Sequence, residues 1–249
     1  MTTLSLIGIG TGNPDHLTGQ AKRAIAEADL ILIPHKGNDK SDLADLRQRI
    51  VSQIRTVDDA TVLFDMPVRD PVLPYLDAVE GWHDAIAHLW AANIKRHPEA
   101  ENVALLVWGD PSLYDSTLRI AARLSPMPRI EVIPGLTSLQ ILTAAHAIPL
   151  NTVGGAVVIT TGRRLREEGW PDGADTVAVM LDGNCAFQTL DVAGIEIWWG
   201  AYLGMPEQIL MTGPLAKVAA EIVEARATAR AGSAAAMAAL NKRIASSRI

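Results

Sequence analysis

The sequence predicts an α/β protein of two domains, the first built on a mostly parallel sheet and the second on a mixed sheet. Apolar runs alternate with helical patterns through the first half of the chain, and the apolar runs follow one another more closely in the second half. The chain has 249 residues, of which 49% are hydrophobic and 20% are charged, and this is enough apolar material for two cores. The predicted domains cover residues 1–136 and 137–249.

The first domain shows the regular alternation expected of a doubly wound sheet. Its short apolar runs predict strands at residues 3–9, 30–34, 61–64, 103–108 and 130–133. Helical periodicity between these runs predicts helices at residues 18–28, 42–54, 75–97 and 116–124. The first of these helices has an N-cap residue, Thr18, at its start.

The second domain has fewer helices between its expected strands. The pattern predicts helices at residues 138–146 and 215–229, and strands at residues 156–160, 176–181, 195–199 and 209–211. The final stretch, residues 230–249, is rich in alanine, serine and arginine, so we expect it to fray.

Composition excludes several classes of function. The apolar runs are shorter than the ~18–20 residues that a membrane span needs. The single cysteine, Cys185, excludes an intramolecular disulfide framework and a thiolate metal cluster, and no histidine spacing predicts a metal site. The net charge of −6 argues against nucleic-acid binding. Residues 1–12 lack the pattern of a signal peptide, so we expect a cytoplasmic enzyme.

A glycine-rich segment follows the first expected strand. Gly8, Gly10 and Gly12 allow a tight turn and a close approach of the backbone to a ligand, and Pro14 ends the segment. A dinucleotide loop is disfavoured because the spacing is G-x-G-x-G and because no acidic residue ends the second strand. A turn that ends a strand and binds nothing remains an open alternative.

Three further motifs lie at expected strand ends, where ligands of open α/β sheets gather. They are W-G-D-P-S-L-Y at 108–114, I-P-G-L-T-S-L at 133–139 and I-T-T-G-R-R at 159–164. Asp110 offers acceptors for a small cofactor, Thr137 and Ser138 can cap a helix or donate to a carboxylate, and the arginines suit a polycarboxylate. An Asp-Pro turn and a solvated basic loop are the corresponding alternatives.

These motifs occur in order over nearly the whole chain, together with V-M-L-D-G at 179–183 and Y-L-G-M-P-E-Q at 202–208. In this order they resemble the tetrapyrrole methylases, the class III S-adenosylmethionine-dependent methyltransferases. The resemblance implies a cofactor cleft between the two domains, S-adenosylmethionine as cofactor with S-adenosylhomocysteine as product, no metal, and a homodimer. It also moves the glycine-rich segment, with Gly8, Gly10 and Gly12, from a cofactor loop to the substrate trough.

The resemblance carries over a set of cofactor contacts. These are Pro14, Gly109, Asp110, Pro111, Leu113, Tyr114, Thr137, Ser138, Leu181, Asp182, Tyr202 and Leu203. Leu181 and Asp182 stand where the family commonly has Met-Gly, so side-chain contacts at these two positions differ from the family pattern.

Within the family, the segments 34–47, 106–119, 159–165 and 198–210 point to a methylase of corrin-ring biosynthesis that acts on precorrin-5. This reaction releases the C-1 acetyl group as acetate and methylates C-1, so it needs a base for water and a donor for the oxyanion. The catalytic candidates are His35, Lys36, Asp39, Asp110, Tyr114 and Asp115. The candidates for the substrate carboxylates are Lys36, Lys40, Arg119, Arg163, Arg164 and Arg166.

Two other functions are compatible with the motifs. One is a methylase of the same family that acts on another precorrin, a protein or an RNA. The other is an NAD(P)-dependent reductase that uses the glycine-rich segment. A wide, basic groove would favour a macrocyclic substrate, and binding of NADPH in place of S-adenosylmethionine would favour the reductase.

Overall fold

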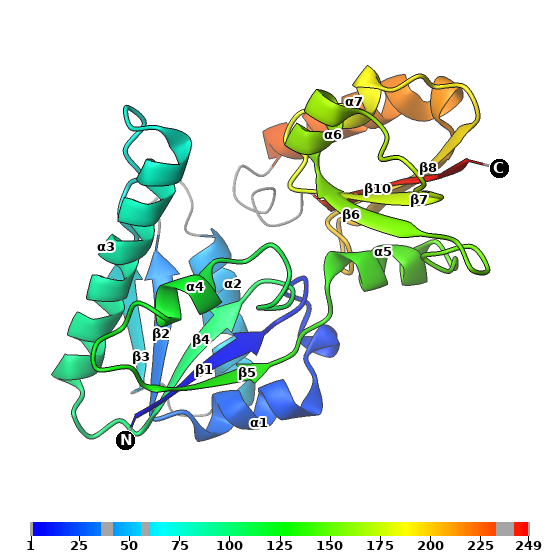
Figure 1. Ribbon diagram of the computed structural model, residues 1–249. Coiled ribbons are helices and arrows are strands. Elements are labelled where there is room, and N and C mark those ends of the chain that lie inside the picture. Colours follow the sequence, from blue (N-terminus) through cyan, green and yellow to red (C-terminus); the bar gives the residue numbers. More distant parts are fainter. Residues whose placement is uncertain (1, 36–41, 56–59, 233–241, 249) are drawn as a thin grey trace. The chain divides into compact units, whose positions relative to one another are not determined.

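The computed structural model describes residues 2–35, 42–55, 60–232 and 242–248. The chain divides into two compact units, Met1–Leu136 and Thr137–Ile249, and Figure 1 shows one sheet in each. We describe each unit by itself.

The sheet of the first unit is parallel throughout, as predicted. Its strands are β1 (Thr3–Gly8), β2 (Leu30–His35), β3 (Thr61–Asp65), β4 (Asn102–Val107) and β5 (Arg129–Ile133), in the order β3-β2-β4-β1-β5. All five carboxyl ends therefore meet at one edge, where the first three motifs begin.

Helices cover both faces of this sheet, because side chains alternate along each strand. The described helices are η1 (Pro14–His16), α1 (Gly19–Glu27), α2 (Asp42–Ile54), α3 (Tyr75–Arg96) and α4 (Thr117–Ala121) (Figure 1). Leu30 and Leu32 pack in a cluster with α3 and α4, whereas Ile31 and Ile33 pack in a cluster with α1 and α2. This is the doubly wound arrangement that the sequence predicts.

The sheet of the second unit is mixed, again as predicted. Its strands are β6 (Val157–Thr161), β7 (Thr176–Met180), β8 (Ile195–Ala201), β9 (Ile209–Pro214) and β10 (Lys242–Arg248), in the order β6-β7-β10-β8-β9. Only the β6–β7 pair is parallel among these described strands. Figure 1 shows α5 (Ser138–Ala145) on one face and α6 (Gly162–Glu168) and α7 (Leu215–Gly232) on the other, with η3 (Ala186–Thr189) beside α6.

The expectation that residues 230–249 fray is wrong for residues 230–232 and 242–248, the part of this stretch that the structure describes. The helix α7 continues to Gly232, and Lys242–Arg248 form β10 in the middle of the second sheet. Because β10 pairs with β7 on one side and β8 on the other, its stability comes from backbone hydrogen bonds to both neighbours. Its composition gives no sign of this position, since Ile244 is its one large apolar residue.

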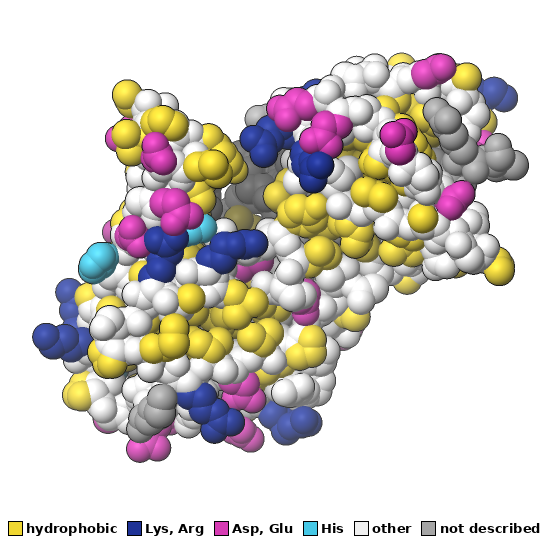
Figure 2. Space-filling view, viewed as in Figure 1, with side chains coloured by type: hydrophobic (Ala, Val, Ile, Leu, Met, Phe, Trp, Pro, Cys, Tyr) yellow, Lys and Arg dark blue, Asp and Glu magenta, His cyan; other side chains and the backbone are white. Residues whose placement is uncertain are grey.

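The first unit carries an exposed apolar tip where α3 begins. Figure 2 shows hydrophobic side chains there, and Val68, Val72 and Leu76 are 93%, 88% and 72% exposed. An apolar surface of this kind is typical of contact regions. Among the described residues, no helix is long and apolar enough to cross a membrane.

Candidate functional site

Glycines allow three loops to touch at the carboxyl edge of the first sheet. Gly10 and Gly109 exchange backbone hydrogen bonds, with N–O distances of 3.2 and 2.7 Å. A Cβ atom on Gly8 would lie 2.5 Å from the nitrogen of Gly135, and one on Gly135 would lie 2.2 Å from the oxygen of Gly109. The backbones after β1, β4 and β5 are thus packed together with no room for a side chain.

Gly12 lies over Trp108, the residue that follows β4. A Cβ atom on Gly12 would lie 2.6 Å from the indole ring, and the φ angle of Gly12 is +95°. The segment then passes through Asn13, whose side chain accepts from the Asp15 nitrogen, into Pro14 at the start of η1. The fold therefore sets the predicted Gly12 and Pro14 beside the W-G-D-P segment.

Asp110 links the β4 loop to the β5 loop. One carboxylate oxygen accepts from the Ser112 nitrogen at 2.8 Å and from the Ser112 hydroxyl, and the other accepts from the Gly135 nitrogen at 2.9 Å. Burial alone would raise the pKa of this carboxyl, but the hydrogen bonds from Ser112 and Gly135 outweigh it, so the pKa lies below its usual value. Asp110 is therefore ionised at neutral pH and is held by backbone donors.

The rest of the β4 loop is fixed by local hydrogen bonds. After Pro111, the Leu113 nitrogen donates to the backbone carbonyl of Asp110. The Asp115 carboxylate accepts from the Thr117 nitrogen at 2.6 Å. Arg119 donates to the Asp115 carbonyl at 2.8 Å. Tyr114, between these bonds, has a φ angle of +50° and an exposed side chain. Strained backbone of this kind in a non-glycine residue is concentrated at functional sites.

His35, predicted as a catalytic base, has a partner that sequence reasoning missed. Its Nδ1 lies 3.1 Å from a carboxylate oxygen of Asp65, the last residue of β3. The register of β2 and β3 places the two residues side by side. Asp65 ends the strand in the same way that His35 ends its own, and this signal was present in the sequence. With Nδ1 held, Nε2 is the ring nitrogen left for proton transfer.

In the second unit, the predicted Thr137 and Ser138 form the start of α5. Thr137 caps the helix, and the Thr137 nitrogen donates to the side-chain oxygen of Gln140 at 2.7 Å. Ser138 is buried, and its hydroxyl has no hydrogen-bond partner among the described residues. A donor in this position at the positive end of a helix suits a ligand carboxylate.

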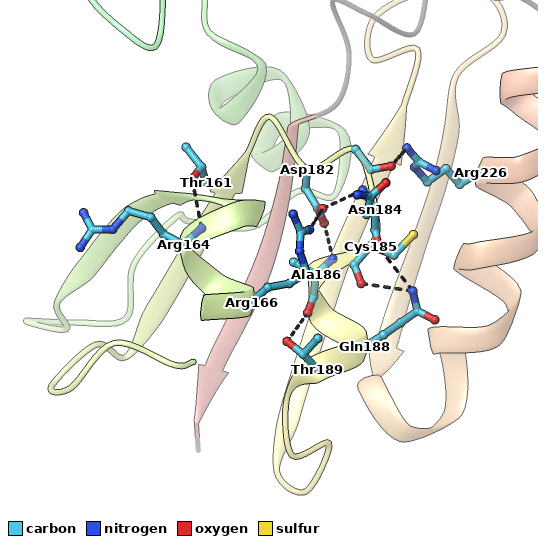
Figure 3. Close-up of polar contacts among 11 residues, drawn as sticks. Thr161, Arg164, Arg166, Asp182, Asn184, Cys185, Ala186, Gln188, Thr189 and Arg226 are labelled. Carbon is cyan, nitrogen blue, oxygen red and sulfur yellow. Dashed lines mark hydrogen bonds and ion pairs between the residues drawn. The ribbon is translucent and has the colours of Figure 1, made fainter. Parts of the chain in front are cut away.

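Asp182 shapes the loop that follows β7, as Figure 3 shows. Its carboxylate accepts from the nitrogens of Asn184 and Ala186 at 3.1 and 2.8 Å, and Arg166 lies 3.6 Å away. A Cβ atom on Gly162 would lie 2.5 Å from the same carboxylate. The Asp182 side chain is thus buried in the loop and does not face solvent. Leu181 before it has a φ angle of +52° and is half exposed.

The expected basic loop at residues 159–166 ends in a helix, α6. Within it, Arg164 pairs with Glu168 through two bonds of 3.0 and 2.8 Å, which lower the pKa of the Glu168 carboxyl. Figure 3 shows Arg166 directed toward Asp182 and Arg164 directed away from it. Arg163 is exposed on the same helix. Arg164 and Arg166 therefore have carboxylate partners within the protein.

Tyr202 and Leu203 follow β8 in another strained turn. Tyr202 has a φ angle of +51°, and its hydroxyl donates to the Ala229 carbonyl of α7 at 2.5 Å. Leu203 is buried against Gly200, whose added Cβ atom would lie 2.5 Å from it. Both side chains pack inside the unit, so a ligand at this turn would meet backbone atoms.

Three of the predicted catalytic and substrate-binding residues lie outside the described residues, namely Lys36, Asp39 and Lys40. Among the residues that are described, no group of three or more His, Cys, Asp and Glu side chains is arranged to hold a metal ion.

Comparison with known proteins agrees with this architecture. The profile of the Tetrapyrrole (Corrin/Porphyrin) Methylases matches residues 3–219. A precorrin-6A synthase [deacetylating] of Sinorhizobium sp is 46% identical over 238 residues, which are 93% of this chain and 91% of that protein.

Two crystal structures show the same fold. The CobF protein of Corynebacterium diphtheriae, described as related to cobalamin synthesis, has a TM-score of 0.81 and 36% identity, with both chains fully covered. The uroporphyrin-III C-methyltransferase of Thermus thermophilus, solved with S-adenosyl homocysteine, has a TM-score of 0.57 and 20% identity over 88% of this chain and 86% of that one. The chain belongs to the tetrapyrrole (corrin/porphyrin) methylase family.

Proposed function

We propose that this protein is an S-adenosylmethionine-dependent C-methyltransferase that converts precorrin-5 to precorrin-6A, with release of the C-1 acetyl group as acetate. The observation that carries the proposal is the 46% identity to a precorrin-6A synthase [deacetylating], because it extends over 93% of this chain. Identity at this level over both units favours the same reaction over one on another precorrin.

The residues proposed for the cofactor fit S-adenosylmethionine. The Ser138 hydroxyl is a buried donor with no partner in the described part of the chain, and it stands at the start of α5. In the same unit, strained turns at Leu181 and Tyr202 present backbone groups at two strand ends. These are positions where the protein can bind the carboxylate and the adenosine of the cofactor. When bound, S-adenosylmethionine supplies an electrophilic methyl group, so the protein needs only to align the reacting carbon with it.

The deacetylation step needs a base, and His35 suits it best. Asp65 orients the ring through Nδ1, so that Nε2 can take a proton from water. The hydroxide oxygen then bonds to the acetyl carbonyl carbon, the bond between that carbon and C-1 breaks, and the electron pair remains on C-1 of the macrocycle. Acetic acid leaves, and C-1 becomes the nucleophile for methyl transfer. Tyr114, with an exposed side chain, is the proposed donor to the oxyanion.

Asp110 and Asp115 take a different role in this proposal. The Asp110 carboxylate accepts from Ser112 in its own loop and from Gly135 in the β5 loop, and the Asp115 carboxylate accepts from Thr117. They are therefore positioning residues for the β4 loop. The four arginines remain proposed contacts of the tetrapyrrole carboxylates, and a substrate would have to replace the protein acceptors of Arg119, Arg164 and Arg166.

Calorimetric titration separates the proposed function from the reductase. S-adenosylhomocysteine is expected to bind with micromolar affinity, and NADPH is expected not to bind. Acetate release from precorrin-5 then separates this activity from methylation of another precorrin. Binding of NADPH alone, or methyl transfer to precorrin-5 with no acetate formed, would contradict the proposal.

The resemblance also carries expectations about assembly and location. A homodimer, a cytoplasmic location and the absence of nucleic-acid and membrane partners remain predictions. Sedimentation equilibrium of the full chain measures the first of them directly.

A further inference from the structure

Arg47 is a buried arginine in the first unit. It lies on α2, and its side chain reaches the carboxyl end of β4, where Nε donates to the Leu106 carbonyl at 3.0 Å. A second nitrogen donates to the Leu43 carbonyl at 3.2 Å. The residue is only 7% exposed, although arginine is among the residues least often buried.

The charge of Arg47 has no carboxylate partner in the described part of the chain. Its two acceptors are neutral carbonyl groups, and it forms no ion pair there within 4.0 Å. Burial lowers the pKa of the guanidinium to about 10, and the more distant charge of Asp115 offsets this in part. The group is therefore a buried cation at neutral pH, an arrangement that proteins seldom keep without a counter-ion.

Trp108 places a buried donor with no acceptor among the described residues next to this cation. The Arg47 guanidinium carbon lies 4.9 Å from the centre of the indole ring, a cation–π contact. The indole Nε1 is buried and has no acceptor among the described residues, although Trp108 as a whole is only partly buried. A buried cation and a buried N–H donor thus lie together, and within the described ranges neither is paired with a carboxylate.

This pair lies beside the glycine-rich segment that the family resemblance assigns to the substrate. A side chain on Gly12 would collide with the Trp108 ring, so the glycine keeps the backbone close to the indole. A planar carboxylate can accept from the guanidinium edge and from an adjacent N–H group at the same time.

We propose that Arg47 and Trp108 Nε1 together bind one carboxylate of the tetrapyrrole substrate beneath the glycine-rich segment. This inference rests on the proposed function, because it takes its ligand from that reaction. The methionyl part of the cofactor also carries a carboxylate, so the test must separate the two sources.

The test compares Arg47→Met, Arg47→Lys and Trp108→Phe with the wild type. We expect Arg47→Met to raise KM for precorrin-5, and its Kd in the presence of S-adenosylhomocysteine, about 10- to 100-fold, the effect of losing a charged hydrogen bond. Arg47→Lys keeps the charge and should raise both less. Trp108→Phe keeps the ring and should raise both several-fold. The Kd of S-adenosylhomocysteine should not change in any of them.

Arg55→Met is the matched control. Arg55 directly follows α2, and the hydrogen bonds of its side chain to described residues likewise go to carbonyls, those of Ile25, Ala26 and Ala28. It should lower the melting temperature and leave KM unchanged. Arg47→Met should keep or raise the melting temperature, since a buried charge without a partner is replaced by an apolar side chain of similar length.

The outcomes distinguish this inference from the proposed function. Suppose that the wild type releases acetate and that Arg47→Met and Trp108→Phe bind precorrin-5 with unchanged affinity. This result would refute the carboxylate site but not the proposed function. A loss of S-adenosylhomocysteine affinity in folded Arg47→Met would assign the site to the cofactor and refute the inference.

Other outcomes bear on the proposed function. A wild type that binds precorrin-5 through Arg47 but forms no acetate would support the site and refute the function. If the wild type bound no precorrin-5, both would be wrong. If Arg47→Met failed to fold, Trp108→Phe would decide in the same way.

Discussion

The pairing of His35 with Asp65 gives the best-defined proton-transfer group among the residues predicted from sequence. The Asp65 side chain is 92% exposed, so its pairing with His35 adds little to the stability of the fold. Its effect is on orientation, because a carboxylate on Nδ1 fixes the ring and leaves Nε2 for proton transfer.

His35→Ala should therefore lower the rate of acetate release by about 10²- to 10⁴-fold without changing the affinity for S-adenosylhomocysteine. Asp65→Asn should cause a smaller loss, because the ring remains but the carboxylate that orients it is replaced by an amide. Glu99→Gln is the control, since Glu99 makes a similar pair with His97, at 3.4 Å, after α3. Full acetate release by His35→Ala would show that another group is the base.

The Asp110 carboxylate makes a second prediction at the residue scale. Its pKa is lower in the folded protein than its ordinary value, so the charged form stabilises the fold above that ordinary value, about 4, and this stabilisation is lost as pH falls through the lower folded value. Asp110→Asn should lower the free energy of unfolding at pH 7 by about 1–3 kcal/mol.

Urea unfolding of wild type and Asp110→Asn at several pH values measures this difference, which should shrink below about pH 4. Asp70→Asn is the control, because Asp70 accepts the same kind of turn bond from Val72 but reaches no second loop. An equal loss in both variants would mean that the bond to Gly135 contributes nothing.

At the scale of elements, the packing of α6 against the loop after β7 explains two residues that sequence reasoning assigned to ligands. Asp182 accepts from loop nitrogens and lies against Gly162, the first residue of α6. Arg166 extends from the same helix toward the carboxylate. The helix and the loop therefore hold each other, and this sets the strained turn at Leu181.

Gly162→Ala should break this contact, because the new methyl group would lie 2.5 Å from the carboxylate. We expect the unfolding free energy to fall by about 1–3 kcal/mol, as in other overpacked sites, together with weaker S-adenosylhomocysteine binding. Gly183→Ala, in the same loop, has open space around its added carbon and should be near neutral. Thermal unfolding and calorimetry of both variants test this, and equal effects would exclude the contact as the cause.

At the scale of the whole molecule, each of the two units depends on one sheet, and the second sheet depends on the last described strand. β10 separates β7 from β8, so the second unit has no continuous sheet without it. The first sheet is complete by Ile133 and contains no strand from the second unit.

A chain that stops after residue 241 should therefore lose the fold of the second unit and keep that of the first. Hydrogen exchange should show the amides of Val177, Val179 and Ile197 losing protection while those of Leu4 and Leu6 remain protected. A chain that stops after residue 248 keeps β10 and is the control. Protected amides on both β7 and β8 in the shorter chain would contradict the central place of β10.

The sequence by itself determined the elements whose side chains are buried in a regular pattern. The parallel strands of the first unit and the amphipathic helices between them follow from apolar periodicity, because a buried strand or helix face must be apolar. The ordered motifs at strand ends likewise determined the family. These features depend on local sequence, so one chain is enough to predict them.

The remaining features follow from contacts between distant segments. β10 is held by backbone bonds to strands distant in sequence, so its composition did not reveal it. The partners of His35 and Asp182, and the burial of Arg47, depend on which strand ends and helix faces meet. The sequence alone does not distinguish a polar side chain that faces solvent from one that contacts a ligand or a backbone amide. Its role is fixed by contacts between segments that are far apart along the chain.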